Sequence, residues 1–206
     1  MDFKIRNEKE SDFFKVENLT REAFWNVYRP GCDEHLLVHN LRSLPCFIKE
    51  LDFVAEIEGN TIGHIIYSRS RVVDNNGKRH EFIAFGPLSV HLDFQRKGIG
   101  KALIEHSFKI AAELGYTAVF ITGNPAYYSR YGFVSASNYD IHLKGVAAED
   151  KADYFMVKLL NPTALDGVTG VFEFDECYNV DKSQLDDFDK FFTPKIKEVR
   201  PGQFGS

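Results

Sequence analysis

The start of the chain changes from a strand-like to a helical pattern of apolar residues. Apolar and polar residues alternate over Phe3–Arg6, and apolar residues recur at helical spacing over residues 13–24. Ser11 stands where the first helix would be capped, and Asp33 stands where a second helix would begin. We expect that second helix to continue to Leu44. The pattern therefore predicts one strand followed by two helices.

The middle of the chain has the period of β-strands. Residues 53–57 and 61–67 lie on either side of the short segment Glu58–Asn60, which is typical of a β-hairpin. A polar loop then leads to residues 81–90, a third strand-like segment. These three strands predict an antiparallel meander.

A helix and further strands follow the meander. Residues 98–114 carry the apolar stripe of an amphipathic helix, and Gly115 is a typical C-terminal stop. Residues 117–121 are continuously apolar, as expected for a strand buried on both faces. The other predicted elements are a short helix at 125–131 and strands at 132–134 and 154–159.

The last part of the chain carries weaker patterns. Signals fade beyond Pro162, and the acidic residues of segment 173–189 favour a solvated face, with attraction of a cationic substrate as the alternative. We expect residues 1–160 to form one domain of mixed α/β structure. Residues 161–206 are expected to form a C-terminal extension that packs on this domain or trails it.

Composition excludes several classes of protein. With 206 residues, 44% of them hydrophobic and 27% charged, the chain can bury one sizeable core, which excludes a disordered tail or a coiled coil. A net charge of -5 argues against non-specific nucleic-acid binding. A charged N-terminus and the lack of a long apolar run lead us to expect a cytoplasmic protein without a membrane span. Three irregularly spaced cysteines argue against a disulfide scaffold.

Two glycines at the start of the 98–114 helix suggest an anion site. Gly98 and Gly100 leave backbone N–H groups unblocked, and these groups together with the helix dipole can hold a pyrophosphate. Arg96, Lys97 and Lys101 add positive charge nearby. The alternative is a tight turn that only begins a helix.

Two common nucleotide-binding patterns do not fit this loop. A Walker loop needs a Lys followed by Ser or Thr after its second glycine, and that pattern is absent. A Rossmann fingerprint needs a third glycine where this chain has Leu103, and the meander does not offer the Rossmann strand order. A dinucleotide-dependent oxidoreductase is therefore disfavoured.

The pattern Gln-x-x-Gly-x-Gly over Gln95–Gly100, after a strand that carries Pro87, resembles the GNAT superfamily of acyl-CoA-dependent N-acetyltransferases. The order of elements over about residues 3–160 is similar too. The resemblance implies a mixed, mostly antiparallel sheet flanked by helices, and a strand that splays at Pro87 to receive the pantetheine arm of CoA. The cofactor-binding residues that it implies are Leu88, Val90, Gln95, Arg96, Lys97, Gly98, Ile99, Gly100, Lys101 and Asn124.

A second motif of the same superfamily lies further along the chain. Tyr128–Phe133 reproduces its Tyr-x-x-x-Gly-Phe pattern, so the resemblance implies that Tyr128 is the general acid. A phenol with a pKa of about 10 can protonate a departing thiolate, whose own pKa is about 8.5. Taken alone, the aromatic cluster indicates packing, and Asn124 is explained equally well by an Asn–Pro turn.

The superfamily pattern gives no general base. Some members carry a glutamate at the position of Ala84, and this chain departs from them there. Glu81 and His91 lie near the two ends of the same strand, but nothing selects either. A water chain, or an amine that arrives neutral, is an equal alternative.

The acceptor site in the superfamily is shaped by the first two helices and their connection. The substrate-side candidates that this implies are Trp25, Tyr28, Arg29, Glu34 and His35. His35, His39, Cys32 and Cys46 are residue types that bind zinc. Their spacing is irregular, however, so we expect no metal.

The resemblance implies transfer of an acetyl group from the co-substrate acetyl-CoA to a primary amine by direct attack. The acceptor is expected to be a small-molecule or peptide amine, and a homodimer is common in the superfamily. None of the three cysteines lies in a motif, so a covalent cysteine route has no support. The alternative is a non-catalytic CoA-binding sensor or interaction module of the same fold.

Overall fold

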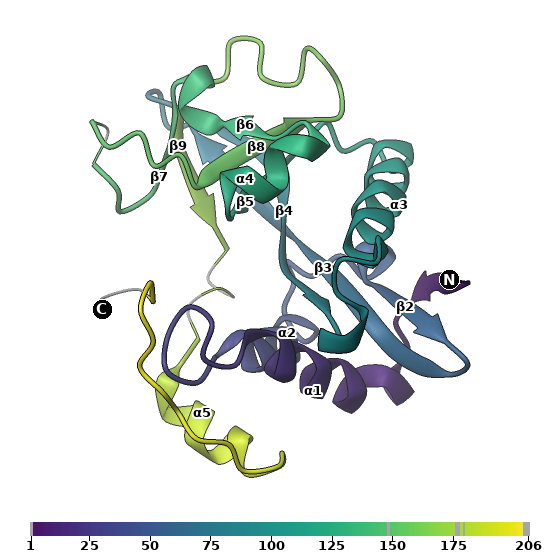
Figure 1. Cartoon of the computed structure of the whole chain (residues 1–206). Coiled ribbons are helices and arrows are strands. Elements are labelled where there is room, and N and C mark those ends of the chain that lie inside the picture. The colour runs from purple at the N-terminus through teal and green to yellow at the C-terminus, as the bar shows by residue number, and fades with distance from the viewer. Residues whose placement is uncertain (1, 148, 176–177, 179, 204–206) are drawn as a thin grey trace. The chain divides into compact units, whose positions relative to one another are not determined.

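The computed structural model describes residues 2–147, 149–175, 178 and 180–203 (Figure 1). The chain divides into two compact units. The first unit comprises Met1–Ile66, Pro87–Ser107 and Cys177–Ser206, and the second comprises Tyr67–Gly86 and Phe108–Glu176. The strands are mostly antiparallel and are accompanied by helices, which confirms the predicted fold class.

Three neighbouring strands form the sheet of the first unit. β1 (Lys4–Asn7) pairs antiparallel with β2 (Phe53–Ile57), which pairs antiparallel with the start of β3 (Asn60–Val73). The register places Val54 opposite His64. The predicted hairpin at residues 53–67 is therefore confirmed.

The first unit also holds the two N-terminal helices and the C-terminal helix. These elements are η1 (Glu10–Asp12), α1 (Phe13–Phe24), α2 (Glu34–Leu41), η2 (Lys49–Leu51), η3 (Leu92–Phe94), the start of α3 (Ile99–Glu113) and α5 (Lys182–Asp189). An apolar core cluster joins α1, α2 and the sheet through Val16, Val38, Leu41, Cys46, Val54 and Ile66.

Two predicted helix boundaries in this unit were wrong. Ser11 does not cap α1, because it lies inside η1, where Asp12 accepts a hydrogen bond from the Lys9 backbone N–H at 2.9 Å. The second helix ends at Leu41 because the chain tightens there. The N–H of Leu44 donates to Leu41 O, three residues back, at 3.0 Å.

The second unit contains a longer run of paired strands. Its strands follow the order β3-β4-β5-β8-β6, while β9 pairs with β3 and with β7. In the described part of the chain, β4 pairs parallel with β5, and β7 pairs parallel with β9. The strands are β4 (Arg79–Val90), β5 (Ala118–Thr122), β6 (Val134–Ser135), β7 (Ile141–Leu143), β8 (Phe155–Leu159) and β9 (Gly170–Phe174).

Short helices connect these strands. They are α4 (Pro125–Tyr128), η4 (Ser129–Tyr131) and η5 (Ala136–Tyr139). The strand predicted at residues 132–134 begins only at Val134, because Gly132 adopts a φ of +81° at the end of η4. The weak patterns beyond Pro162 concealed β9 and α5, and β7 was missed as well.

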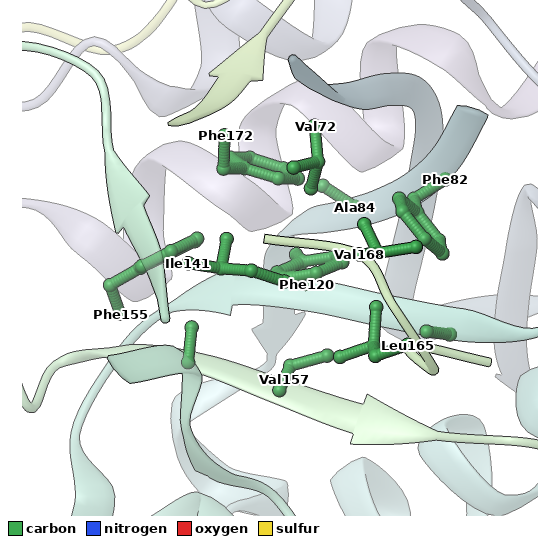
Figure 2. Packing of buried hydrophobic residues seen from close by; sticks show 12 residues of the cluster. Val72, Phe82, Ala84, Phe120, Ile141, Phe155, Val157, Leu165, Val168 and Phe172 are labelled. Carbon is green, nitrogen blue, oxygen red and sulfur yellow. The ribbon is translucent and has the colours of Figure 1, made fainter. Parts of the chain in front are cut away.

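Aromatic side chains fill the core of the second unit, as Figure 2 shows. The ring of Phe120 in β5 stacks on Phe172 of β9, with centroids 4.5 Å apart, and on Phe155 of β8 at 5.7 Å. Residues beyond 160 thus contribute to this core through Phe172, Leu165 and Val168. The expected domain boundary at residue 160 stays a prediction.

No helix in the described part of the chain has both the length and the apolar character that crossing a membrane requires.

Candidate active site

The strand that precedes the glycine loop loses a partner part-way along. β4 pairs with β5 at Ile83 and Ala84, and these pairs lie before Gly86 and Pro87. Gly86 has a φ of +151°, which side chains rarely adopt, and Pro87 has no N–H to donate to a neighbouring strand. The local sequence therefore explains why pairing with β5 does not continue toward the end of β4.

The end of β4 leads into the loop through a hydrogen bond. Leu88 and Val90 are half-buried, and Gln95 Nε2 donates to Val90 O at 3.3 Å. Gln95 therefore ties the loop to the strand.

The glycine loop has the backbone shape of an anion site. Arg96 and Gly98 adopt φ values of +60° and +87°, and α3 begins directly afterwards at Ile99. The Ala102 N–H donates to Gly98 O at 2.9 Å, which is the start of helical bonding. The N–H groups before Ala102 have no acceptor within the helix, so they concentrate positive potential at this end.

Gly98 is required for its conformation. A Cβ added there would meet nothing within 4 Å, whereas a φ of +87° is unfavourable for any side chain. Gly100 is buried in the first turn of α3 beside Ile99. The sequence predicted the same role for both glycines, but the structure shows that Gly98 provides a left-handed backbone conformation while Gly100 is buried in the helix.

Exposed cations surround this loop. Lys101 pairs loosely with Glu105 at 3.7 Å, and Lys97 Nζ lies 5.4 Å from the ring of Phe94. Arg96 and Lys97 have no carboxylate within ion-pair distance among the residues that the structure describes. Their charge is therefore available to an incoming anion.

Tyr128 lies at the end of α4 in the second unit, within an aromatic cluster. Its ring centroid is 4.9 Å from Tyr127, 5.9 Å from Phe85 and 5.7 Å from Phe133. A Cβ added at Gly123 would come far inside van der Waals contact with the Tyr128 ring. Gly123 is thus needed to seat this ring, and the sequence analysis missed it because the clash is visible only in three dimensions.

Asn124 begins the helix that carries Tyr128. Its Oδ1 accepts a hydrogen bond from the Ala126 N–H at 2.9 Å, and Pro125 follows at the first helical position. The turn interpretation of Asn124 is therefore confirmed. Contact of Asn124 with CoA stays a prediction.

The residues considered for a general base differ in burial and in hydrogen bonding. Ala84 is fully buried in the core of the second unit, and Glu81 is exposed. His91 Nδ1 accepts a hydrogen bond from the Asp93 N–H at 3.2 Å in the first unit. These observations select no base.

The substrate-side candidates lie in and after the connection between α1 and α2. Trp25 Nε1 donates to Ile196 O at 3.0 Å, and Arg29 pairs with Asp33 at 2.6 Å. Tyr28 is 40% exposed. Burial raises the pKa of Glu34 to about 7, which is the range that suits proton exchange near neutral pH.

His35 is committed to interior hydrogen bonds. Its Nε2 lies 3.1 Å from Asp189 Oδ1, and its Nδ1 lies 3.5 Å from Cys32 Sγ. Burial lowers the pKa of His35 to about 4, so the ring is neutral at physiological pH. His39 instead contacts Glu17 at 2.9 Å, so the two histidines have different partners.

One cluster in the first unit has the residue types of a metal site. Ligand atoms of Glu8, Asp52 and His64 all lie within 4.8 Å of one another, and all three residues are buried. Both Glu8 oxygens, however, accept hydrogen bonds from Arg42, at 2.9 and 2.7 Å. The guanidinium therefore already supplies the cation that this carboxylate needs.

Comparison with known proteins places the chain in a family. Residues 50–135 match the family model of the acetyltransferase (GNAT) domain. The chain is 33% identical over 175 residues to the uncharacterized N-acetyltransferase YhbS of Escherichia coli K12. The aligned residues cover 85% of this chain and 98% of the relative. The chain therefore belongs to the GNAT family of N-acetyltransferases.

Two solved structures share its fold. The YhbS structure from Escherichia coli, solved in complex with CoA, has a TM-score of 0.75 at 30% identity and covers 86% of this chain and 92% of its own. A GNAT family acetyltransferase from Brucella melitensis, solved in complex with acetyl-CoA, has a TM-score of 0.68 at 25% identity. The match covers 86% of this chain and 98% of that chain.

Proposed function

We propose that this protein transfers the acetyl group of acetyl-CoA to a primary amine by direct attack of that amine. The observation that carries the proposal is the loop at residues 95–101, where a left-handed Gly98 leads into the N-terminus of α3 beside exposed cations. This loop occurs in a chain of the GNAT family. Two structural neighbours were solved with CoA or acetyl-CoA.

The loop has the donor set that a pyrophosphate needs. Backbone N–H groups at the start of α3 and the side chains of Arg96, Lys97 and Lys101 would bind the phosphate oxygens. The backbone of Leu88 and Val90 would hydrogen bond the pantetheine arm, since Pro87 weakens pairing there. Asn124 would add a polar contact through its side chain.

Tyr128 would act as general acid toward the departing sulfur. Its phenol can donate a proton because its usual pKa of about 10 is not far from that of a thiol. The ring contacts with Phe85 and Phe133 would fix its orientation. Direct attack fits the two described cysteines, because Cys32 and Cys46 are both buried; Cys177 lies outside the described residues.

The second candidate is a CoA-binding protein without catalysis. The alanine at position 84, where some family members carry a glutamate, favours it. Tyr128, in contrast, favours catalysis. Release of CoA from acetyl-CoA in the presence of a panel of primary amines separates the two, because only an enzyme accelerates it.

Calorimetric titration with acetyl-CoA tests the cofactor claim first, with desulfo-CoA and NAD as comparison ligands. We expect micromolar binding of acetyl-CoA and at least tenfold weaker binding by Gly98→Glu, since the added carboxylate repels phosphate. Gly77→Glu is a matched control, because Gly77 has a φ of +80° and equally open space but lies in the loop between β3 and β4. Absence of acetyl-CoA binding by the unmodified protein would refute the proposal.

A further inference from the structure

The C-terminal segment, residues 182–203, is hydrogen bonded to α1 and α2 through buried charge. Oδ1 of Asp189 accepts from Arg21 Nε at 2.8 Å and lies 3.1 Å from His35 Nε2. The side chains of Arg21 and His35 are 2% and 0% exposed. Arg21 Nη1 also donates to Thr193 O at 3.1 Å. Two buried groups of the N-terminal helices thus share one carboxylate from the end of the chain.

Asn26 joins the same segment to the connection between α1 and α2, residues 25–33. Its Oδ1 accepts from the N–H of Gly31 at 2.7 Å and from that of Glu198 at 3.1 Å, and its Nδ2 donates to Ile196 O at 3.0 Å. Its own carbonyl accepts from Gln203 Nε2 at 2.9 Å. Asn26 is buried with a φ of +58°, a conformation that asparagine tolerates better than most residues.

The C-terminal segment is also linked to the cofactor strand within the first unit. Ser89 lies between Leu88 and Val90 in β4, and its Oγ donates to Thr20 Oγ1 at 2.9 Å. Thr20 directly precedes Arg21 in α1, and both residues are buried. Two consecutive residues of α1 therefore make separate buried hydrogen bonds, Arg21 to Asp189 and Thr20 to Ser89 of the strand proposed to bind pantetheine.

We propose that Asp189 and Asn26 are positioning residues that hold the 25–33 connection in the conformation that binds the amine. The C-terminal segment is then a required part of the acceptor-binding region. This inference rests on the proposed function, because it assigns Tyr28 and Arg29 of the connection to the acceptor. Both side chains are already occupied: Asn26 is buried and its amide is hydrogen bonded, while the half-buried Asp189 uses Oδ1 for Arg21 and His35 and has Lys197 Nζ 4.0 Å from Oδ2.

Two variants of the full chain test the role of the segment. Asp189→Asn removes the charge with little change of shape. Asn26→Gly keeps access to the left-handed conformation and removes only the side-chain hydrogen bonds. Asp187→Asn is the matched control, because Asp187 lies on the same helix, is 79% exposed and pairs with Lys190.

The only tryptophan of the chain reports on docking of the segment. Trp25 is buried, and Cζ of Arg21 lies 4.2 Å from the centroid of its ring. Its Nε1 donates a hydrogen bond to Ile196 O. We expect its fluorescence to move to longer wavelength in Asp189→Asn and Asn26→Gly and to stay unchanged in Asp187→Asn. Unchanged emission in both test variants would overturn the positioning role. If Asp189→Asn fails to fold, the fluorescence of Asn26→Gly alone tests the positioning role.

Steady-state kinetics with the best amine of the panel complete the test. We expect the KM for that amine to rise about tenfold in both test variants, with kcat and the calorimetric affinity for acetyl-CoA within about twofold of the unmodified protein. Shifted emission with an unchanged amine KM would overturn the inference and leave the segment a purely structural role. Lack of turnover by the unmodified protein would instead overturn the proposed function and, with it, the acceptor role.

Discussion

The two compact units bury different kinds of side chains. The core of the second unit contains packed aromatic rings, with Phe120, Phe155 and Phe172 in mutual contact (Figure 2). The first unit buries charge, since Arg42 is 6% exposed and is bonded to Glu8 and Glu17. Apolar packing does not depend on pH, whereas buried charges are stable only in particular protonation states. The first unit is therefore expected to be the pH-sensitive one.

The charged cluster of the first unit contains an excess of acidic groups. Burial raises the pKa of Glu8 to about 7 and that of Asp52 to about 6, and it lowers the pKa of His64 to about 4. His64 Nε2 lies 2.9 Å from Asp52 Oδ1. Near neutral pH the cluster accordingly favours a neutral His64 and partial protonation of its carboxyl groups.

Removal of an aromatic ring from the second core should give the largest effect on stability. Phe120→Ala is expected to lower the free energy of unfolding by about 3–5 kcal/mol, because it leaves a cavity among rings that cannot collapse fully. Urea unfolding at pH 5 and pH 8 should give the same loss. Phe191→Ala, at a residue 73% exposed, is the control, and a similar loss there would contradict the explanation.

Removal of the buried cation should be nearly as costly but dependent on pH. Arg42→Met leaves Glu8 without its cation and Glu17 with His39 alone, and we expect a loss of about 3 kcal/mol at pH 8. The loss should be smaller at pH 5, where Glu8 takes up a proton. Urea unfolding measures both values, with the exposed pair variant Arg200→Met as control. Equal losses at the two pH values would refute this account of the cluster.

Loss of the Tyr128 hydroxyl should affect turnover and not binding. Tyr128→Phe is expected to lower kcat by roughly ten- to a thousandfold, since the thiolate loses its proton donor while the aromatic contacts remain. Acetyl-CoA affinity by calorimetry should stay the same, in contrast to Gly98→Glu in the first unit. Wild-type turnover in this variant would remove Tyr128 from the mechanism.

The last effect concerns the proton on Glu8. A folded-state pKa above the unfolded value of about 4.3 stabilises the protein at low pH, and this contribution is lost as pH rises toward 7. Glu8→Gln imitates the protonated form, so its stability relative to the unmodified protein should rise by about 3 kcal/mol between pH 4.5 and pH 8. The difference between the two unfolding curves isolates Glu8 from Asp52 and His64. A difference that does not change with pH would show that Glu8 is ionised throughout.

Elements with a strong local period were predicted well. The amphipathic helix that begins after Gly98 and the apolar strand before Gly123 were placed within one or two residues. In contrast, β9 is short and mixes apolar with polar residues without a clear period. Its pairing with β3 joins residues about a hundred positions apart in the chain, such as Arg71 and Glu173. Pairing over such a separation is favoured by burial of Phe172 and leaves little trace in the local sequence.

The sequence by itself predicted those candidate site residues that belong to short local patterns. Gly98 before a helix and Tyr128 before Gly132–Phe133 are local patterns, because backbone conformation and spacing along a few residues decide them. Only the tertiary structure decided which distant groups meet. Asp189 was predicted on a solvated acidic face, but it is 13% exposed because Arg21 and His35, more than 150 positions away, need a buried carboxylate. The buried charge of Arg21 and the buried polar ring of His35 would both be unfavourable without a partner, and no local pattern records that cost.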